Sequence, residues 1–234
     1  MKLQRKRVLW KRNGALTVAW ALLITLYPPL PALSGTITDE IKTVVDRIVT
    51  VLTDPAFTAP EKKQERDKLL HTIASERFDW EEMAKRSIGT TWRELSQAQQ
   101  QEFIAVFVDF LERTYLAKID QFLQKSKDFS SRNITYTKET VEGRYALIES
   151  VIRIQDQQLP LHYKMIQKNN TWKVYDVTIE GIGLVANYRS QFSEILAKES
   201  FESLMKRLRE KQSDAALGGK ALAPLSDSNR SAPL

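Results

Sequence analysis

The sequence holds few side chains that could carry out metal or acid–base chemistry. It has no cysteine and two histidines, His71 and His162, and neither histidine belongs to a His-Glu-x-x-His or similar helical pair. A zinc site needs several Cys, His or carboxylate ligands at defined spacing. We therefore expect no metal ion and no other cofactor.

Two pairs of carboxylates have the spacing that acid–base chemistry would need. Glu81 and Glu82 stand at the start of a predicted helix, and Asp176 and Glu180 stand near the end of a predicted strand. Both positions are typical of capping or solvated carboxylates. The chain contains no Gly-x-Ser-x-Gly motif, and Gly181-Ile182-Gly183 lacks the third glycine of a dinucleotide-binding loop. These patterns favour a protein that is not an enzyme, with a hydrolase that uses Asp176 and Glu180 as an alternative.

The formal net charge of +6 arises at the N-terminus. Residues 1–35 hold six basic residues and no acidic one, so the remainder of the chain holds 29 basic and 29 acidic residues. Binding to DNA or RNA usually requires a concentrated positive surface that offsets the phosphate charge. The neutral remainder therefore argues against a nucleic-acid partner.

The N-terminal segment has the organisation of a secretory signal. Its basic residues precede the uncharged run 15–27, which ends at Pro28 and Pro29, and small residues follow up to Ser34. The run of 13 residues is shorter than the ~20 apolar residues that a membrane-spanning helix needs. We predict a signal peptide over residues 1–34 with cleavage near Ser34, and hence an exported protein.

Behind the signal, apolar residues recur at spacings of three and four, which predicts amphipathic helices. The expected helices cover 38–52, 58–73, 79–89, 96–122, 184–196 and 201–208. Ser96 and Gln99 form a capping pattern at the start of the longest of these helices, and Thr58 with Glu61 forms another. The longest helix carries an apolar stripe that is rich in aromatic residues, from Phe103 to Phe122.

Between residues 130 and 180 the apolar residues alternate with polar ones, which predicts β-strands. Turn residues divide this region at 142–143, 155–158 and 168–170, so we expect four consecutive antiparallel strands. The predicted fold is α+β, with helices packed on one face of a four-stranded antiparallel sheet. We assign a single domain to residues 35–212 and a disordered tail to residues 213–234.

Two segments carry a resemblance to a known family. One is Trp172–Phe192, which reads WKVYDVTIEGIGLVANYRSQF, and the other is Phe78–Ala84, which reads FDWEEMA and is followed by Trp92 and Gln101-Glu102-Phe103. In these segments the chain resembles the MlaC family, the periplasmic auxiliary components of an ABC transporter linked to toluene tolerance. Gly183 departs from the pattern, because the family commonly has serine there, and this puts in doubt only the local capping of the following helix.

The resemblance implies a soluble carrier in the periplasm of a Gram-negative bacterium. Such a carrier would hold a phospholipid with its acyl chains in an apolar pocket between helices and sheet. It would shuttle lipid between an outer-membrane lipoprotein complex and an inner-membrane MCE-type substrate-binding protein of an ABC transporter, which maintains outer-membrane asymmetry. The expected lipid-binding residues are Phe103, Phe107, Phe110, Tyr115, Ile148, Ile152, Tyr163, Val177, Ile179, Val185 and Tyr188.

Within that expectation, the aromatic stripe of the long helix faces the apolar side of the sheet. Arg189 is a candidate partner for a lipid phosphate, although an ion pair with Asp176 or Glu180 is the simpler expectation. An adaptor that binds only proteins and carries no lipid is a further alternative. In such an adaptor the protein's own side chains would fill the core.

Overall fold

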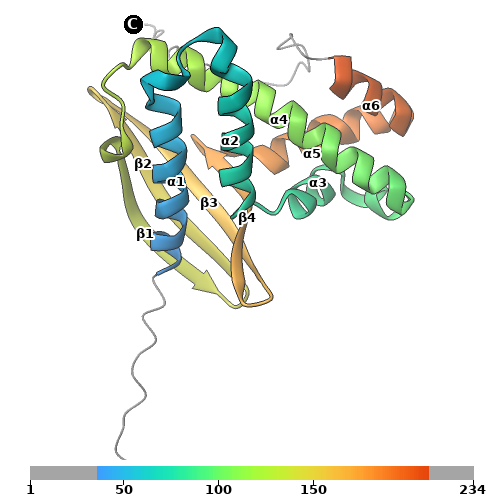
Figure 1. Ribbon diagram of the computed structural model, residues 1–234. Coiled ribbons are helices and arrows are strands. Elements are labelled where there is room, and N and C mark those ends of the chain that lie inside the picture. The colour runs from blue at the N-terminus through green and yellow to red at the C-terminus, as the bar shows by residue number, and fades with distance from the viewer. Residues whose placement is uncertain (1–35, 211–234) are drawn as a thin grey trace, which may run out of the picture. The chain divides into compact units, whose positions relative to one another are not determined.

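Helices cover one face of a twisted antiparallel sheet (Figure 1). The structure is a computed structural model and describes residues 36–210. The predicted signal peptide and the predicted disordered tail lie outside the described residues. The α+β class predicted from the sequence is confirmed, whereas the domain limits 35 and 212 stay a prediction.

In residues 36–210, four α-helices precede the strands of the sheet along the chain, and two α-helices follow them. The α-helices are α1 (Ile37–Thr53), α2 (Lys63–Ser75), α3 (Trp80–Ile88), α4 (Gln97–Lys125), α5 (Leu184–Leu196) and α6 (Phe201–Glu210). The strands are β1 (Ile134–Glu142), β2 (Tyr145–Ile154), β3 (Gln157–Lys168), β4 (Thr171–Ile179) and β5 (Ile182–Gly183). Short 3-10 turns η1 (Pro55–Phe57), η2 (Pro60–Lys62), η3 (Gly89–Arg93) and η4 (Ser131–Asn133) connect some of these elements.

The start of α4 agrees with the sequence, and the start of α2 does not. The side chains of Ser96 and Gln99 form a reciprocal capping box at the first turn of α4. The hydroxyl of Thr58, in contrast, donates to the carbonyl of Pro55 instead of capping a helix. Two prolines, Pro55 and Pro60, begin separate 3-10 turns, and α2 therefore begins only at Lys63.

The strands pair in chain order, and within residues 36–210 the sheet has five strands where four were predicted. The additional strand, β5, is two residues long and pairs with the end of β4. A two-residue strand is too short to show alternation, so sequence patterns miss it. The reversal before it runs through Glu180 and Gly181, which adopt φ of 49° and 82°.

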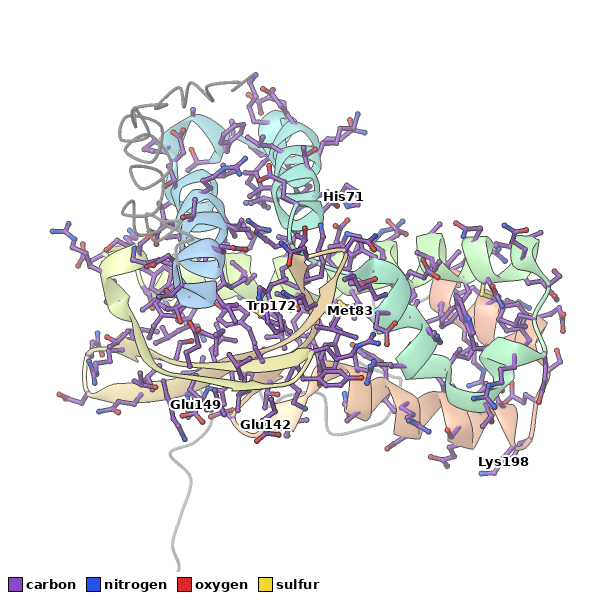
Figure 2. All side chains as sticks on the ribbon, turned by 90° about the horizontal axis from the view of Figure 1, so that it is seen from below. His71, Met83, Glu142, Glu149, Trp172 and Lys198 are labelled. Atoms are coloured by element: carbon purple, nitrogen blue, oxygen red, sulfur yellow. The ribbon has the colours of Figure 1, made fainter. Side chains whose placement is uncertain are left out.

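The register of the sheet separates its two faces. Ile148, Tyr163 and Val177 lie side by side on β2, β3 and β4 and point toward the helices. Figure 2 shows Glu149 on the side of the sheet away from the helices, whereas Trp172 lies between the sheet and the helices. One face of the sheet is therefore apolar, as the alternation predicts.

The buried apolar residues form two clusters. The helical cluster comprises Met83, Ala84, Ile88, Trp92, Phe103, Phe107, Phe110, Leu111, Val185, Tyr188, Phe192, Leu204, Met205 and Leu208. The sheet cluster comprises Ile37, Ile41, Val45, Val49, Ala146, Ile148, Tyr163, Met165, Val174, Val177 and Leu184. Half-buried Tyr115, in the middle of α4, packs against both clusters.

The aromatic stripe of α4 does not face the sheet along its whole length, contrary to the sequence-based expectation. Phe103 and Phe107 pack against α5 and α6 in the helical cluster. The 29 residues of α4 span about 43 Å at ~1.5 Å per residue. Five strands span only about 20 Å, because they are separated by four gaps of ~4.8 Å. One half of α4 therefore extends beyond the sheet and must find partners among the other helices.

Candidate functional site

The structure divides the predicted lipid-binding residues between the two clusters. Those in the helical cluster are Phe103, Phe107, Phe110, Val185 and Tyr188. Those in or against the sheet cluster are Ile148, Tyr163, Val177 and Ile179, and Tyr115 contacts both clusters. Ile152 is half-buried on β2 and pairs with Ile134 of β1 and Leu159 of β3.

The aromatic residues of the helical cluster pack tightly on one another. The ring centroid of Phe107 lies 5.6 Å from that of Phe103, 5.7 Å from that of Tyr188 and 5.7 Å from that of Phe192. Phe103, Phe107 and Phe192 are fully buried. These distances are those of ordinary aromatic core packing. A lipid-binding role for this part of the predicted set stays a prediction.

Around the sheet cluster, large apolar side chains remain only half-buried. On the sheet these are Ile134, Tyr136, Ile152, Leu161 and Ile179, and beside it are Phe122 of α4 and Phe129 of the following loop. We call these seven residues the open apolar face. Phe129 packs against the sheet cluster, and its ring contacts that of Phe122 at 5.3 Å between centroids. The second half of α4 and the sheet thus present a common apolar surface.

Tyrosine hydroxyl groups are among the polar groups of this region. The Tyr136 hydroxyl is buried and has no hydrogen-bond partner within residues 36–210. The hydroxyl groups of Tyr115 and Tyr188 influence each other's pKa, so the two side chains lie close together. Burial raises the pKa of Tyr115, Tyr136 and Tyr163 well above the usual value, so all three stay neutral. The alternation in β1 pointed to Tyr136 as an inward residue, but no sequence signal marks its hydroxyl as unpaired.

Asp176 has a structural partner for each carboxylate oxygen. Oδ1 accepts a hydrogen bond from the backbone N–H of Val185 at 3.0 Å, and Oδ2 accepts one from Lys164 Nζ at 3.1 Å. Glu180, its proposed catalytic partner, is exposed in the turn before β5. Both Asp176 oxygens are therefore occupied, Oδ1 by a contact that holds α5 against the sheet and Oδ2 by a contact between neighbouring strands.

Arg189 does not form the ion pair expected from the sequence. Asp176 pairs with Lys164 instead, and the guanidinium of Arg189 lies beside Gly89. A Cβ at Gly89 would stand 3.6 Å from Arg189 Nε. This contact joins the end of α3 to α5, beside the helical cluster.

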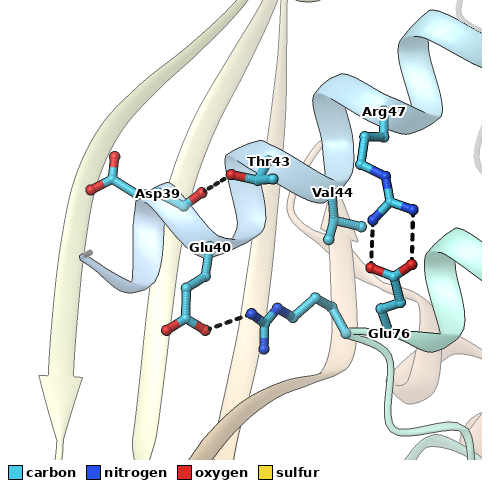
Figure 3. Close-up of a pocket in the computed structure, with 7 residues that line it drawn as sticks. Asp39, Glu40, Thr43, Val44, Arg47 and Glu76 are labelled. Atoms are coloured by element: carbon cyan, nitrogen blue, oxygen red, sulfur yellow. Dashed lines mark hydrogen bonds and ion pairs between the residues drawn. The ribbon is translucent and has the colours of Figure 1, made fainter. Parts of the chain in front are cut away.

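A separate pocket of about 420 Å³ opens beside α1 (Figure 3). Its lining is polar. Arg47 forms a bidentate ion pair with Glu76 at 2.5 and 2.8 Å, and Arg77 forms an ion pair with Glu40 through one contact of 3.2 Å. An acyl chain would gain little by entering a pocket lined with paired charges. This pocket is therefore not the apolar pocket that the sequence led us to expect.

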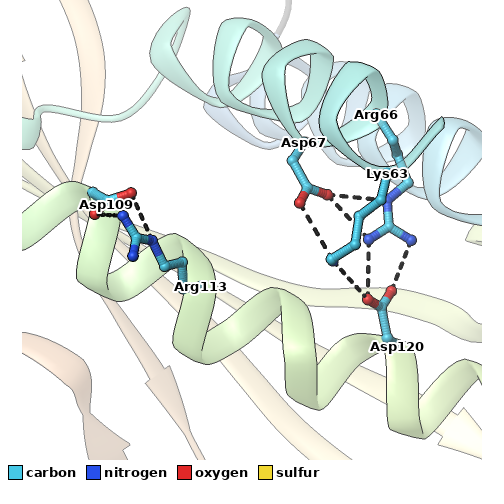
Figure 4. A network of polar contacts seen from close by, with 6 residues as sticks. All are labelled: Lys63, Arg66, Asp67, Asp109, Arg113 and Asp120. Atoms are coloured by element: carbon cyan, nitrogen blue, oxygen red, sulfur yellow. Dashed lines mark hydrogen bonds and ion pairs between the residues drawn. The ribbon is translucent and has the colours of Figure 1, made fainter. Parts of the chain in front are cut away.

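Ion pairs join α2 to the second half of α4 (Figure 4). Arg66 donates to both oxygens of Asp120, at 2.8 and 3.0 Å, and also contacts Asp67. Burial alone would raise the pKa of Asp120, but Arg66 and Lys63 outweigh it and hold that pKa below its usual value. The network ties α2 to α4 next to the open apolar face.

Among residues 36–210, no three His, Cys, Asp or Glu residues lie close enough to hold a metal ion. In the same part of the chain, no helix combines the length and apolarity needed to cross a bilayer.

The fold of a helical layer over an antiparallel sheet is also found in solved structures. One similar structure is a phospholipid-binding protein from Ralstonia solanacearum, solved in complex with a phospholipid. The TM-score is 0.63 at 24% sequence identity, and the match covers 74% of this chain and 95% of that chain. A comparison with curated proteins finds no match.

The family model of the MlaC protein matches residues 42–210. This chain therefore belongs to the MlaC family, and the resemblance stated from the two sequence segments is confirmed.

Proposed function

We propose that this protein is a periplasmic carrier of phospholipid and not an enzyme. The observation that carries the proposal is the open apolar face beside the sheet cluster, in a chain of the MlaC family. A group of large apolar side chains that the fold leaves only half-buried is a candidate for binding an apolar ligand. The phospholipid bound to the structurally similar protein supports the choice of ligand.

In this proposal the acyl chains lie along the sheet, beneath the second half of α4. The residues that would contact them are Tyr115, Ile148, Ile152, Tyr163, Val177 and Ile179 from the predicted set, together with the open apolar face. The other predicted residues, Phe103, Phe107, Phe110, Val185 and Tyr188, would line the deep end, where the helical cluster begins.

The energetics define what such a site must do. Burial of one methylene is worth ~0.8 kcal/mol, so the roughly thirty methylenes of a diacyl lipid resist exposure to water by tens of kcal/mol before opposing terms. A carrier must offer an interior close to that of the bilayer, because one that bound much more tightly would not release its lipid. No covalent step is needed, and Asp176 and Glu180 have no catalytic role in this proposal.

The export route and the membrane partners in this proposal are inferred from membership of the MlaC family. An export signal over residues 1–34 would deliver the chain to the periplasm. There it would exchange lipid with an outer-membrane lipoprotein complex and with an inner-membrane MCE-type protein of an ABC transporter, and so maintain outer-membrane asymmetry. Membership of the MlaC family supports these partners.

Native mass spectrometry of the purified protein tests the proposal directly. We expect one bound species with the mass of a phospholipid. A protein free of lipid that binds only proteins would favour an adaptor instead. Loss of a hydrolytic activity on replacement of Asp176 and Glu180, with lipid content unchanged, would favour an enzyme.

A charge in the site gives a sharper test. Val177→Glu places a carboxylate in the sheet cluster, where it would draw in water and abolish the co-purified lipid. Ile152→Glu makes the same change at a half-buried position that the fold tolerates more readily. Val141→Glu is the control, because Val141 is 49% exposed near the end of an edge strand. Retention of phospholipid by both site variants would show that the lining is assigned wrongly.

A further inference from the structure

A lysine interrupts the apolar stripe of α4 next to the open apolar face. Lys118 follows Tyr115 by three residues and precedes Phe122 by four. Residues at these spacings share one face of a helix. Tyr115 packs against the sheet cluster, and Phe122 contacts Phe129, which also packs against it. Lys118 therefore stands at the edge of the open apolar face.

The ammonium group of Lys118 has no counter-charge in the part of the chain that the structure describes. No carboxylate lies within 4.0 Å of it, whereas Lys63, Lys164 and Lys168 each pair with one or two carboxylates. Its Nζ atom lies 5.4 Å from the ring centroid of Tyr115, within the range of a cation–π contact.

Lys118 is also partly removed from water. The residue is half-buried, and this burial lowers the pKa of its amine. A partly desolvated cation gains from an anion placed against it. An apolar contact along the side-chain stem explains part of the burial, but among residues 36–210 no protein group accepts a hydrogen bond from the ammonium.

Arg189, the cation first considered for a lipid phosphate, lies elsewhere. Its guanidinium packs beside Gly89 at the junction of α3 and α5. Lys118, in contrast, shares a helix face with residues of the proposed lipid site.

We propose that Lys118 binds the phosphate group of the lipid and holds the head group at the rim of the open apolar face. This inference rests on the proposed function, because it needs acyl chains bound beside α4. The ammonium acts as a point charge on a phosphate oxygen, which all phospholipids share. Lys118 would therefore favour lipids that carry a phosphate over neutral diacyl lipids, with little choice among head-group substituents.

Two lipids with the same acyl chains distinguish the contribution of the phosphate to binding from that of the acyl chains. Dioleoyl phosphatidylglycerol carries the phosphate and dioleoylglycerol lacks it, and each is titrated into lipid-free protein. Loss of one charge-assisted hydrogen bond weakens binding about tenfold. We expect Lys118→Gln to lose about tenfold in affinity for phosphatidylglycerol and to bind dioleoylglycerol as the unaltered protein does.

Two variants serve as controls. Lys118→Arg keeps the charge and should retain most of the affinity for phosphatidylglycerol. Lys85→Gln removes an exposed lysine of α3 that has no carboxylate within 4.0 Å among the described residues, and it should bind both probes normally.

The remaining outcomes separate this inference from the proposed function. Equal losses for both probes, or no loss for either, would overturn the role of Lys118 and leave the carrier function intact. If the unaltered protein binds neither probe, the proposed function itself fails. Saturation of the Lys118 ammonium by inorganic phosphate alone, followed through its NMR signal in lipid-free protein, would assign the site to free phosphate and overturn the head-group role.

Discussion

The carboxylate of Asp176 on β4 accepts a hydrogen bond from the backbone N–H of Val185 in the first turn of α5. Asp176 is 3% exposed and also pairs with Lys164. The residue before the helix, Gly183, has no side chain that could cap it. The sheet therefore supplies the cap that the helix lacks, and it locks the start of α5 to β4.

This arrangement predicts that a side chain at Gly183 destabilises the protein while Asp176 is present. A Cβ at Gly183 would stand 2.7 Å from Asp176 Oδ2. We expect Gly183→Ala to lower the free energy of unfolding by about 1–3 kcal/mol through this clash. Asp176→Ala should lower it by about 1–2 kcal/mol through loss of the cap. Urea unfolding of both variants measures these values.

The double variant Asp176→Ala, Gly183→Ala tests whether the clash with the Asp176 carboxylate causes the loss of stability. In the Asp176→Ala background the clash is gone, so Gly183→Ala should have little further effect, and the two losses should not add. Additive losses would show that the alanine is rejected by something other than the carboxylate.

Asp120→Asn should destabilise the protein in a pH-dependent way. Arg66 would keep its hydrogen-bond partners but lose one of its two counter-charges, since Asp67 remains, and we expect a loss of about 1–2 kcal/mol at neutral pH once solvent screening is allowed for. The pKa of Asp120 is lowered in the folded state, so the stabilisation is fully present above the ordinary value of about 3.9 and is lost as the pH falls below it.

Unfolding curves of the Asp120 variant and the unaltered protein should therefore converge in acid. The difference in unfolding free energy should shrink as the pH is lowered from about 5 to about 3. A difference that stays constant over this range would exclude the ion pair as its origin.

The two half-buried tyrosines should respond in opposite ways to removal of the hydroxyl. Tyr136→Phe deletes a buried hydroxyl that has no partner, so lipid-free protein should be unchanged or gain up to about 1 kcal/mol. Tyr115→Phe deletes a hydroxyl that lies near that of Tyr188, and it should lose about 1 kcal/mol. Thermal unfolding of lipid-free protein distinguishes the two. A marked loss for Tyr136→Phe would reveal a partner that we have not identified.

Phe107 and Phe122, in the two halves of α4, should contribute very differently to stability. Phe107 is fully buried among other rings, and Phe107→Ala should cost about 3–5 kcal/mol of stability. Phe122 is half-buried on the open apolar face, so Phe122→Ala should cost only about 1 kcal/mol but lower the amount of co-purified lipid. Stability comes from urea unfolding and lipid content from native mass spectrometry. If Phe122→Ala leaves the lipid content unchanged, the acyl chains do not lie beneath the second half of α4.

The sequence by itself determined the elements and the family. Period-two alternation identifies β1 to β4, and the capping box of Ser96 and Gln99 places the start of α4, because both signals depend on neighbouring residues alone. The MlaC family could likewise be recognised from two short segments. The start of α2 was misplaced, since two prolines favour 3-10 turns over a capped helix at Thr58.

Only the tertiary structure decided which partners the inward residues meet. Periodicity assigns Phe107 and Phe122 to one stripe, yet the first packs among helices and the second lies near the sheet, because α4 is longer than the sheet is wide. In the same way, the sequence shows that Asp176 can cap or pair. Its contacts with Val185 and Lys164 arise only once β3, β4 and α5 come together. Local patterns specify which face of an element is buried, whereas the identity of the neighbour depends on how the whole chain packs.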